Sequence, residues 1–389
     1  MQLSIFVLVY ATVQCLVLAH PGHAEKSGEP QLLRYKASLR KRYDDCLSVL
    51  GTDGLNSRSM ARRSLMAESL RTRRGLSSRD TDDVLNTSHL YSESHAVTLA
   101  ESGFFGHSGI CILNPQGDNG PFWVKGEFIR SGILEDQPGV PVVLEFQFID
   151  VSTCSPVEGL YVDTWSCNST GIYSGVQGPG NGNIDDESNL DKTFLRGVQK
   201  SNNDGIVVFK TLFPGHYAGR STHHHIVAHH NATLLPNNTL TGGSVPHIGQ
   251  LFWDQDLINK VEATAPYNTN SVELLANEND YVFAQETNGT TSDPVLNYVY
   301  LGKSLEQGLF GWTTIVVDLS AEYSPNYSFV WTENGSEEAG DGIEDLFPSG
   351  WETLTAPPGA SAPQTSESEV PATNSTSTPG RPEAPTEWA

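Results

Sequence analysis

The sequence has little positive charge and, after its first residues, no long apolar run. Its 389 residues contain 23 Lys and Arg against 46 Asp and Glu, and the net charge of −23 disfavours binding to nucleic acid or to an anionic membrane. No stretch after Leu18 is apolar for long enough to cross a bilayer, and no sustained heptad repeat indicates a coiled coil. The sequence therefore predicts an acidic protein with neither a nucleic-acid nor a membrane partner.

Cysteine is also scarce, and the five cysteines that are present predict two disulfides. Cys15 lies in an N-terminal segment that we expect to be removed, which leaves an even number for an oxidising compartment. Four cysteines allow three pairings. We favour Cys154–Cys167, which would join two neighbouring strands, together with Cys46–Cys111, which would fix the N-terminal segment.

The first residues have the character of a secretory leader. Leu3 to Leu18 form a mainly apolar run, and Val17-Leu18-Ala19 is a plausible cleavage site. Residues 1–19 are therefore predicted to be a signal peptide, and the mature protein is predicted to be secreted and extracellular. Eight Asn-x-Ser/Thr sequons permit glycosylation, at Asn86, Asn168, Asn231, Asn237, Asn288, Asn326, Asn334 and Asn374.

Residues 20–95 are predicted to form an N-terminal helical arm or a pro-segment. Most of the basic residues gather near the N-terminus, since residues 1–80 hold 13 Lys and Arg against 7 Asp and Glu. Residues 31–50 could form an amphipathic helix. We favour an arm packed on the main domain; the alternative is a pro-segment cut at Lys41-Arg42, Arg62-Arg63 or Arg73-Arg74.

Short strand signals separated by Gly, Pro and Asn turns predict the main domain, residues 96–330. The predicted strands cover residues 122–129, 141–149, 159–167, 206–212, 223–229, 248–253, 281–285 and 312–319. Such a pattern predicts an all-β protein, either a β-sandwich or a barrel. Residues 331–389 are acidic at first and then rich in Pro, Ser and Thr, so we expect a disordered tail.

A histidine run on one predicted strand indicates a metal site. Side chains two residues apart point to the same face of a strand, so His223 and His225 can share an ion while His224 points away. Imidazole binds iron, zinc and copper, whereas tyrosinate is a hard anionic donor that favours a trivalent ion. Tyr173 and Tyr217 could supply such donors. The alternative is a solvated histidine patch with tyrosines in the core.

The order of these residues resembles the intradiol ring-cleavage dioxygenases. The resemblance covers roughly residues 120–255, and its best match is the secreted, fungal-type subgroup. The segments that carry it are Val162-Asp-x-Trp-x-x-Asn-x-x-Gly-x-Tyr, Phe194-Leu-Arg-Gly, Asp204-Gly, Phe213-Pro-Gly-x-Tyr, Arg220-x-x-His-x-His and Gly249-Gln-Leu-Phe. It implies a prealbumin-like antiparallel β-sandwich and an Fe(III) cofactor. The implied reaction uses O2 to open a catechol-type aromatic diol to a muconate-type diacid.

The resemblance also implies a role for each site residue. Tyr173 and His223 would be equatorial iron ligands, and Tyr217 and His225 axial ones. Tyr217 would leave the iron and accept a substrate proton. Arg220 would stabilise anionic charge on the substrate, and Gln250 would line the same pocket.

Two positions depart from the family pattern, and two other functions stay open. His224 replaces an apolar residue and Gly219 replaces a tryptophan, which suggests a more open and polar site. The alternatives are a zinc hydrolase or lyase that uses His223, His225 and His229, and a non-catalytic prealbumin-like binding module. The oligomeric state is left open, a homodimer being one option.

Overall fold

A computed structural model of the chain covers the strand-rich region and part of the N-terminal arm. It describes residues 54–76, 110–111, 117–182, 186–287 and 293–340, together with positions 34, 35, 37–39, 41, 42, 45 and 46. The predicted signal peptide, most of the predicted arm and the predicted tail after residue 340 lie outside these residues. Across the described ranges, none of the helices combines the length and apolarity that a bilayer crossing requires.

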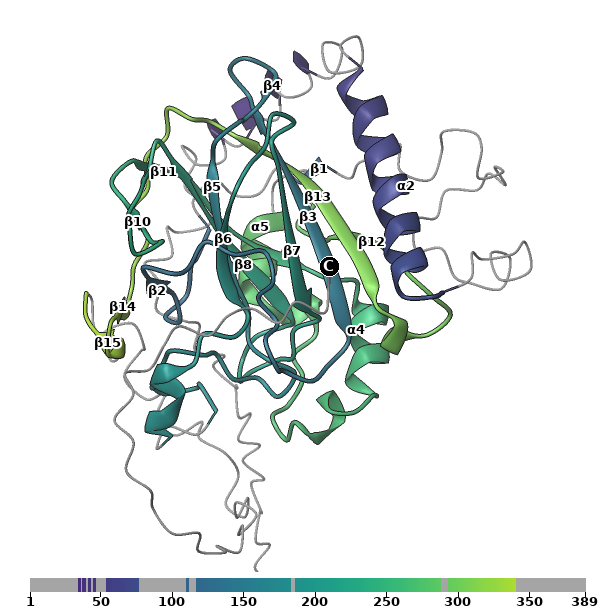
Figure 1. The fold of residues 1–389 in the computed structure, drawn as a ribbon, viewed down its shortest axis with the longest axis vertical. Helices are drawn as coiled ribbons and strands as arrows, with labels where there is room; N and C mark the ends of the chain where they lie inside the picture. The colour runs from purple at the N-terminus through teal and green to yellow at the C-terminus, as the bar shows by residue number, and fades with distance from the viewer. Residues whose placement is uncertain are drawn as a thin grey trace, which may run out of the picture.

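Two sheets face each other as a sandwich (Figure 1). One sheet consists, in order, of β11 Ser244–Phe252, β8 His223–His230, β5 Tyr161–Trp165 and β6 Arg196–Lys200. In the other, β3 Pro141–Asp150 and β13 Leu309–Val317 lie side by side, with β7 Ile206–Leu212 and β4 Ser155–Pro156 pairing with β3 and with β12 Asn297–Tyr300 and β1 Ile110–Cys111 pairing with β13. Six of the eight predicted strands are confirmed with small shifts at their ends.

The prediction of a purely antiparallel sandwich was wrong. β3 and β13 pair in parallel along nine residues, from Leu309 opposite Val142 to Val317 opposite Asp150. Period-2 alternation fixes which face a side chain occupies, but it carries no information on strand direction. The mostly-β architecture itself agrees with the prediction.

The core lies between the two sheets, and the central strand β3 is buried on both of its faces. Val142, Leu144, Phe146 and Phe148 point inward and pack against residues of β5, β8 and β11. Burial of these side chains is the main source of stability in such a sandwich. The alternate residues of β3 point outward, where N-terminal segments cover them.

Helix α2, Leu55–Arg73, lies along the outer face of this sheet (Figure 1). Its Ala67 packs with Val143, Phe310 and Trp312 of the strands below. Arg63 is buried and contacts Glu145 of β3 at 2.8 Å. The helix therefore covers the sheet as the predicted arm would, and the Arg62-Arg63 pair lies within it.

The remaining helices are short. They are α4 Gln255–Glu262, α5 Tyr281–Thr287, and the 3-10 helices η1 Glu187–Asp191, η2 Tyr267–Thr269, η3 Asn277–Asn279 and η4 Leu305–Gln307. The predicted strand at residues 281–285 was wrong, because these residues form α5. The Asp280 carboxylate accepts hydrogen bonds from the Val282 and Phe283 amides and so favours a helix start. The short apolar run Tyr281-Val-Phe-Ala, which is rich in strand formers, concealed this capping signal.

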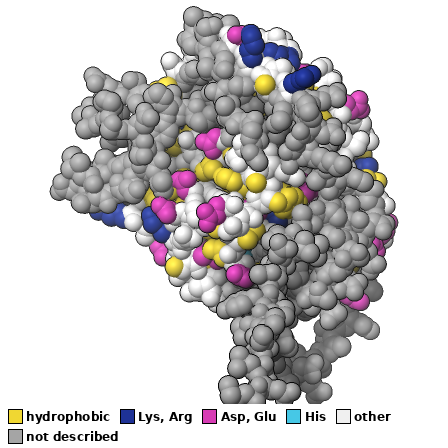
Figure 2. Space-filling view, turned by 180° about the vertical axis from the view of Figure 1, so that it is seen from behind, with side chains coloured by type: hydrophobic (Ala, Val, Ile, Leu, Met, Phe, Trp, Pro, Cys, Tyr) yellow, Lys and Arg dark blue, Asp and Glu magenta, His cyan; other side chains and the backbone are white. Residues whose placement is uncertain are grey.

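Two predicted boundaries also need correction. Only β2, Val124–Lys125, forms within the predicted strand at 122–129. β14 Phe329–Thr332 pairs with β2 and with β15 Gly335–Glu338, so the ordered chain continues past the predicted domain end at residue 330. A further hairpin joins β9 Thr233–Leu234 to β10 Leu240–Thr241. The surface facing away from the viewer of Figure 1 has Asp and Glu scattered over its described part (Figure 2).

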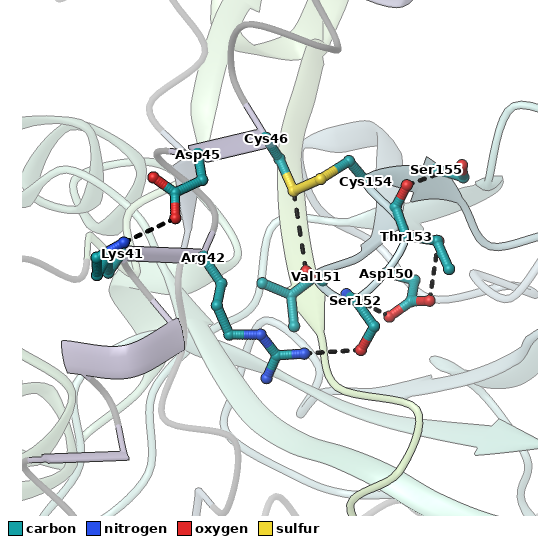
Figure 3. The surroundings of a disulfide bond; sticks show 10 residues. All are labelled: Lys41, Arg42, Asp45, Cys46, Asp150, Val151, Ser152, Thr153, Cys154 and Ser155. Carbon is teal, nitrogen blue, oxygen red and sulfur yellow. Dashed lines mark hydrogen bonds and ion pairs between the residues drawn. A yellow bond between two sulfur atoms is a disulfide. The ribbon is translucent and has the colours of Figure 1, made fainter.

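The predicted cysteine pairing was wrong. Cys46 is bonded to Cys154, which ties the N-terminal segment to the turn after β3 (Figure 3). Cys167 is a buried free cysteine whose thiol donates to the Gly215 carbonyl oxygen. Cys154 and Cys167 lie before and after β5 in the chain, so the strand separates the two residues that we expected to pair. The side chain of Cys111 lies outside the described part of the structure.

Candidate metal centre

His223 and His225 of β8 meet on the face of their sheet that points away from the other sheet. The Nε2 atoms of His223 and His225 lie 3.0 Å apart. His223 Nδ1–H donates a hydrogen bond to the Ser221 carbonyl oxygen at 2.6 Å, which leaves a lone pair on Nε2. Burial lowers the pKa of His223, with a further contribution from Arg220, so the ring is neutral. Trp165 stacks on the His225 ring at 4.7 Å and fixes its orientation.

Both predicted tyrosines reach the same place. The Tyr173 hydroxyl lies 3.0 Å from His225 Nε2, and the Tyr217 hydroxyl lies 3.4 Å from His223 Nε2. Both tyrosine side chains are buried, with exposed fractions of 0% and 2%. Burial raises the pKa of each phenol. In the absence of a cation, both tyrosines therefore stay protonated.

The two tyrosine loops are pressed against each other at glycines. Gly215 precedes Tyr217 by two residues, and a Cβ there would lie 2.6 Å from the carbonyl oxygens of Asn168 and Ser169. Gly171 precedes Tyr173 by two residues and has φ +87°, and a Cβ there would overlap the His216 carbonyl oxygen. The glycines of both motifs thus allow the backbone contact that places the two phenols together.

The backbone of Tyr173 is clamped by residues that the sequence analysis gave no role. The Asn181 side chain accepts from the Tyr173 amide at 2.6 Å, and the Asn181 and Asn189 side chains both donate to the Tyr173 carbonyl oxygen. Arg196 donates to the Ser174 carbonyl oxygen at 2.8 Å and to that of Phe122 at 2.6 Å. The Phe-Leu-Arg-Gly segment therefore holds the first tyrosine loop in place.

Arg220 and Gln250 lie beside the tyrosine and histidine side chains. Arg220 is 1% exposed, and its Nη1 lies 3.4 Å from the Tyr217 hydroxyl. Its Nη2 donates to Gln250 Oε1 at 2.6 Å. Gln250 in turn donates to the Asp118 carbonyl oxygen at 2.5 Å. Gln250 thus connects the guanidinium to the backbone at Asp118.

Three residues at the site escaped the sequence analysis. Asp280 forms an ion pair with Arg220 at 2.9 Å, and Tyr281 lies with its ring 5.4 Å from the Arg220 guanidinium carbon. Phe122 packs on both metal-site tyrosines. Asp280 could have been found as a helix N-cap. No local pattern places Phe122 or Tyr281 near the histidines.

Two other histidines of β8 lie away from the four converging side chains. His224 points between the sheets, with its ring 6.0 Å from that of Trp253. It therefore does not make the site more polar, and our inference from this position was wrong. His229 packs on Trp123 and faces Asp163 at 3.9 Å. His229 therefore does not converge with His223 and His225, which disfavours a zinc site made of these three histidines.

Gly219 has a backbone reason to be glycine. Its φ is +76°, a conformation that side chains disfavour, and it lies in the turn between Tyr217 and Arg220. The turn conformation therefore explains the glycine, and a more open site is not needed to account for it.

The spacing of the four donor atoms fits a single ion. Ligand atoms bound at about 2.1 Å lie about 3.0–3.4 Å from each other when their angles at the ion are about 90–109°. The three hydrogen-bond-length contacts of the site are 3.0, 3.0 and 3.4 Å. Two imidazoles and two phenols that ionise beside a strong cation make a donor set suited to a trivalent metal.

Comparison with known proteins points to one family. No family model and no curated protein matches the chain. Among solved structures, an intradiol ring-cleavage dioxygenase from Tetranychus urticae is 30% identical, over 55% of this chain and 97% of that one, with a TM-score of 0.46. Another dioxygenase structure is also 30% identical, over 55% and 98% of the two chains, with a TM-score of 0.44.

The identity and the nearly full coverage of these relatives settle the class. The chain belongs to the intradiol ring-cleavage dioxygenase family, whose members are oxidoreductases that use O2.

Proposed function

We propose that the protein is a secreted, non-heme Fe(III) enzyme that opens the ring of a catechol-type diol with O2 to give a muconate-type diacid. The observation that carries this proposal is the convergence of two imidazole nitrogens and two phenol oxygens at contacts of 3.0 to 3.4 Å. Tyr173, Tyr217, His223 and His225 would hold the iron. Two tyrosinates favour a trivalent over a divalent ion.

The surrounding residues would divide the chemical work among them. A bound ferric ion would supply Lewis acidity and make a chelated catecholate reactive toward O2. Burial raises the pKa of the Tyr217 phenol, so a released Tyr217 phenolate is a strong base and would take a proton from a substrate hydroxyl. Arg220 contacts the Tyr217 hydroxyl and would donate a hydrogen bond to negative charge that develops on the substrate.

Sequence and covalent features support the extracellular setting. The apolar run at residues 3–18 and the sequons fit a secreted glycoprotein. The Cys46–Cys154 bond fits an oxidising compartment. Asn168 donates to Gln137 and accepts three hydrogen bonds, so its amide is engaged and we expect no glycan there. Assignment to the secreted, fungal-type subgroup stays a prediction.

The proposal is tested on the full-length chain produced by secretion. We expect about one iron per chain, wine-red tyrosinate charge transfer, and O2-dependent conversion of catechol or hydroxyquinol to a diacid, measured by absorption, metal analysis and mass spectrometry. Tyr173→Phe and Tyr217→Phe should shift or weaken the band. A colourless, zinc-loaded native protein would support the hydrolase alternative, and a metal-free inert protein would support the binding module.

A further inference from the structure

A buried carboxylate holds Arg220 from outside the motifs of the site. Asp280 has an exposed fraction of 0% and lies 60 residues along the chain from Arg220. Its two oxygens accept from Arg220 Nε at 2.9 Å, from Arg220 Nη2 at 3.3 Å and from the Ser221 amide at 2.8 Å. They also accept from the Val282 and Phe283 amides at 2.9 and 3.0 Å. Asp280 therefore joins the start of α5 to the turn before β8.

These contacts fix the direction in which the guanidinium points. A guanidinium has five N–H donors in one plane. The Nε and Nη2 edge faces Asp280 and Gln250, and the Nη1 end faces the Tyr217 hydroxyl at 3.4 Å. The donors on the Asp280 side are thus engaged, and the donors that remain lie toward the metal-site tyrosine.

Tyr281 restrains the same group from a second direction. Its ring lies 5.4 Å from the Arg220 guanidinium carbon, a distance typical of a cation–π contact. Its hydroxyl donates to Asp118 Oδ2 at 2.7 Å. The Asp118 carbonyl oxygen accepts from Gln250, which itself accepts from Arg220. The guanidinium is therefore enclosed by a ring of contacts that starts and ends at the Asp280-Tyr281 pair.

Capping α5 does not by itself require a carboxylate. Asn or Ser accepts the first helical amides about as well as Asp does. The guanidinium has a stricter need, because a buried cation requires an opposite charge that also accepts hydrogen bonds from its N–H groups. Asn cannot replace both carboxylate oxygens of Asp280. When its one oxygen caps α5, its NH2 group faces the Arg220 Nε–H, so that two donors oppose each other.

We propose that Asp280 is a positioning residue for the ring-cleavage reaction, which holds the Arg220 guanidinium so that its Nη1 end points to the Tyr217 side of the site, where a substrate would bind. This inference rests on the proposed function. Asp280 acts through Arg220 and does not itself touch the reacting atoms.

The test is Asp280→Asn in the iron-loaded full-length chain. The variant keeps an acceptor for the α5 amides but loses the ion pair, so kcat on catechol should fall about 10²-fold while iron content stays at the wild-type level. The charge-transfer band should shift, because the Arg220 donor to the Tyr217 oxygen is displaced. Titration with 4-nitrocatechol, followed by absorption, reports binding without turnover and should show weaker affinity.

Two further variants separate positioning from simple loss of structure. Asp186→Asn is the matched control, because Asp186 also accepts a backbone amide at the start of a helix, in η1, while its carboxylate accepts from Ser188 and not from Arg220. It should leave kcat and the band unchanged. The effects of Arg220→Lys and Asp280→Asn should not add, since Asp280 acts through the guanidinium. If Asp280→Asn is unfolded by circular dichroism, Asp280→Ser provides the same loss of charge with a shorter cap.

The outcomes are distinguishable. A wild-type protein that binds iron but does not cleave catechols overturns the proposed function and, with it, the role of Asp280. Active wild-type protein together with an Asp280→Asn variant of equal kcat, 4-nitrocatechol affinity and band position overturns the positioning role alone. Additive effects with Arg220→Lys would also overturn it.

Discussion

At the scale of single residues, the strand parity of the histidine run decides which rings meet. His223 and His225 bring their Nε2 atoms to 3.0 Å, and the intervening His224 lies against Trp253 on the other face. A one-residue shift in register would exchange the two faces. The candidate metal site therefore depends on the pairing of β8 with β5 and β11, in which Gln250 lies opposite His225.

This parity predicts unequal effects from three neighbouring substitutions. His223→Ala and His225→Ala should each lose iron and ring-cleaving activity, because each removes a nitrogen donor. His224→Ala should retain iron and colour, with a loss of stability of about 1–3 kcal/mol from the vacated core volume. Metal analysis and thermal unfolding check this. Loss of iron from His224→Ala with retention in His223→Ala would contradict the register.

A second prediction at this scale concerns acid sensitivity at His247. Its side chain is 1% exposed, neither ring nitrogen has a hydrogen-bond partner among the described residues, and burial lowers its pKa to about 3 from 6.5. The unfolded chain binds this proton more readily, so the contribution to stability is complete above pH 6.5 and is lost as the pH falls toward 3. In wild type this proton makes the free energy of unfolding fall by about 1.4 kcal/mol per pH unit below pH 6.5, and His247→Leu should remove that contribution.

Denaturant titrations at several pH values check the His247 prediction by the difference between variant and wild type. The other ionisable groups contribute equally to both proteins and cancel. Parallel slopes for the two proteins between pH 6 and 4 would show that His247 does not titrate differently on folding.

At the scale of elements, α2 is bound to the sheet by charge as well as by apolar contact. Glu145 has an exposed fraction of 0% and pairs with Arg62 at 2.9 Å and with Arg63 at 2.8 Å. A buried carboxylate is costly without its partners. Arg62 and Arg63 of α2 thus compensate the buried negative charge of Glu145 on the outer face of β3.

A double-mutant cycle tests this role of α2. Arg63→Met should lower the free energy of unfolding by about 3–5 kcal/mol, because it leaves Glu145 buried with a weakened partner set. The Arg63→Met/Glu145→Gln pair should recover much of that loss. Chemical denaturation provides the measurement, and strictly additive effects would argue against the pairing. Cleavage at Arg62-Arg63 of folded protein should be slow, since the pair lies within the helix.

At the scale of the whole molecule, one disulfide joins segments that are distant in the chain. Cys46 and Cys154 are separated by 108 residues. A cross-link that closes so long a loop restricts the unfolded chain strongly. The N-terminal segment, the sheet below it and α2 are thereby held as one unit (Figure 1).

The thiol chemistry of the protein should follow this arrangement. Peptide mapping without reduction should find a Cys46–Cys154 cross-linked fragment, and Cys46→Ser should lower stability by about 2–5 kcal/mol. Cys167 should react with iodoacetamide only after unfolding, because burial raises the pKa of its thiol and shields it. A cross-link between Cys154 and Cys167, or rapid alkylation of folded protein at Cys167, would contradict the structure.

The sequence alone determined what depends on neighbours in the chain. Period-2 alternation identified the strands at 141–149 and 206–212, and the His-x-His spacing placed two rings on one face. The order of the motifs, through the family resemblance, predicted the four donors and Arg220, and the structure brings these five side chains together. These features are local, so a single sequence carries them.

Only the tertiary structure decided what depends on segments far apart. Asp280 lies 60 residues from Arg220, Cys46 lies 108 residues from Cys154, and the direction of β13 beside β3 has no local signature. α5 looked like a strand because a short continuous apolar run fits a strand and a helix equally well. Contacts of this kind form when the chain closes on itself, and their partners are selected by packing and charge compensation in the folded interior.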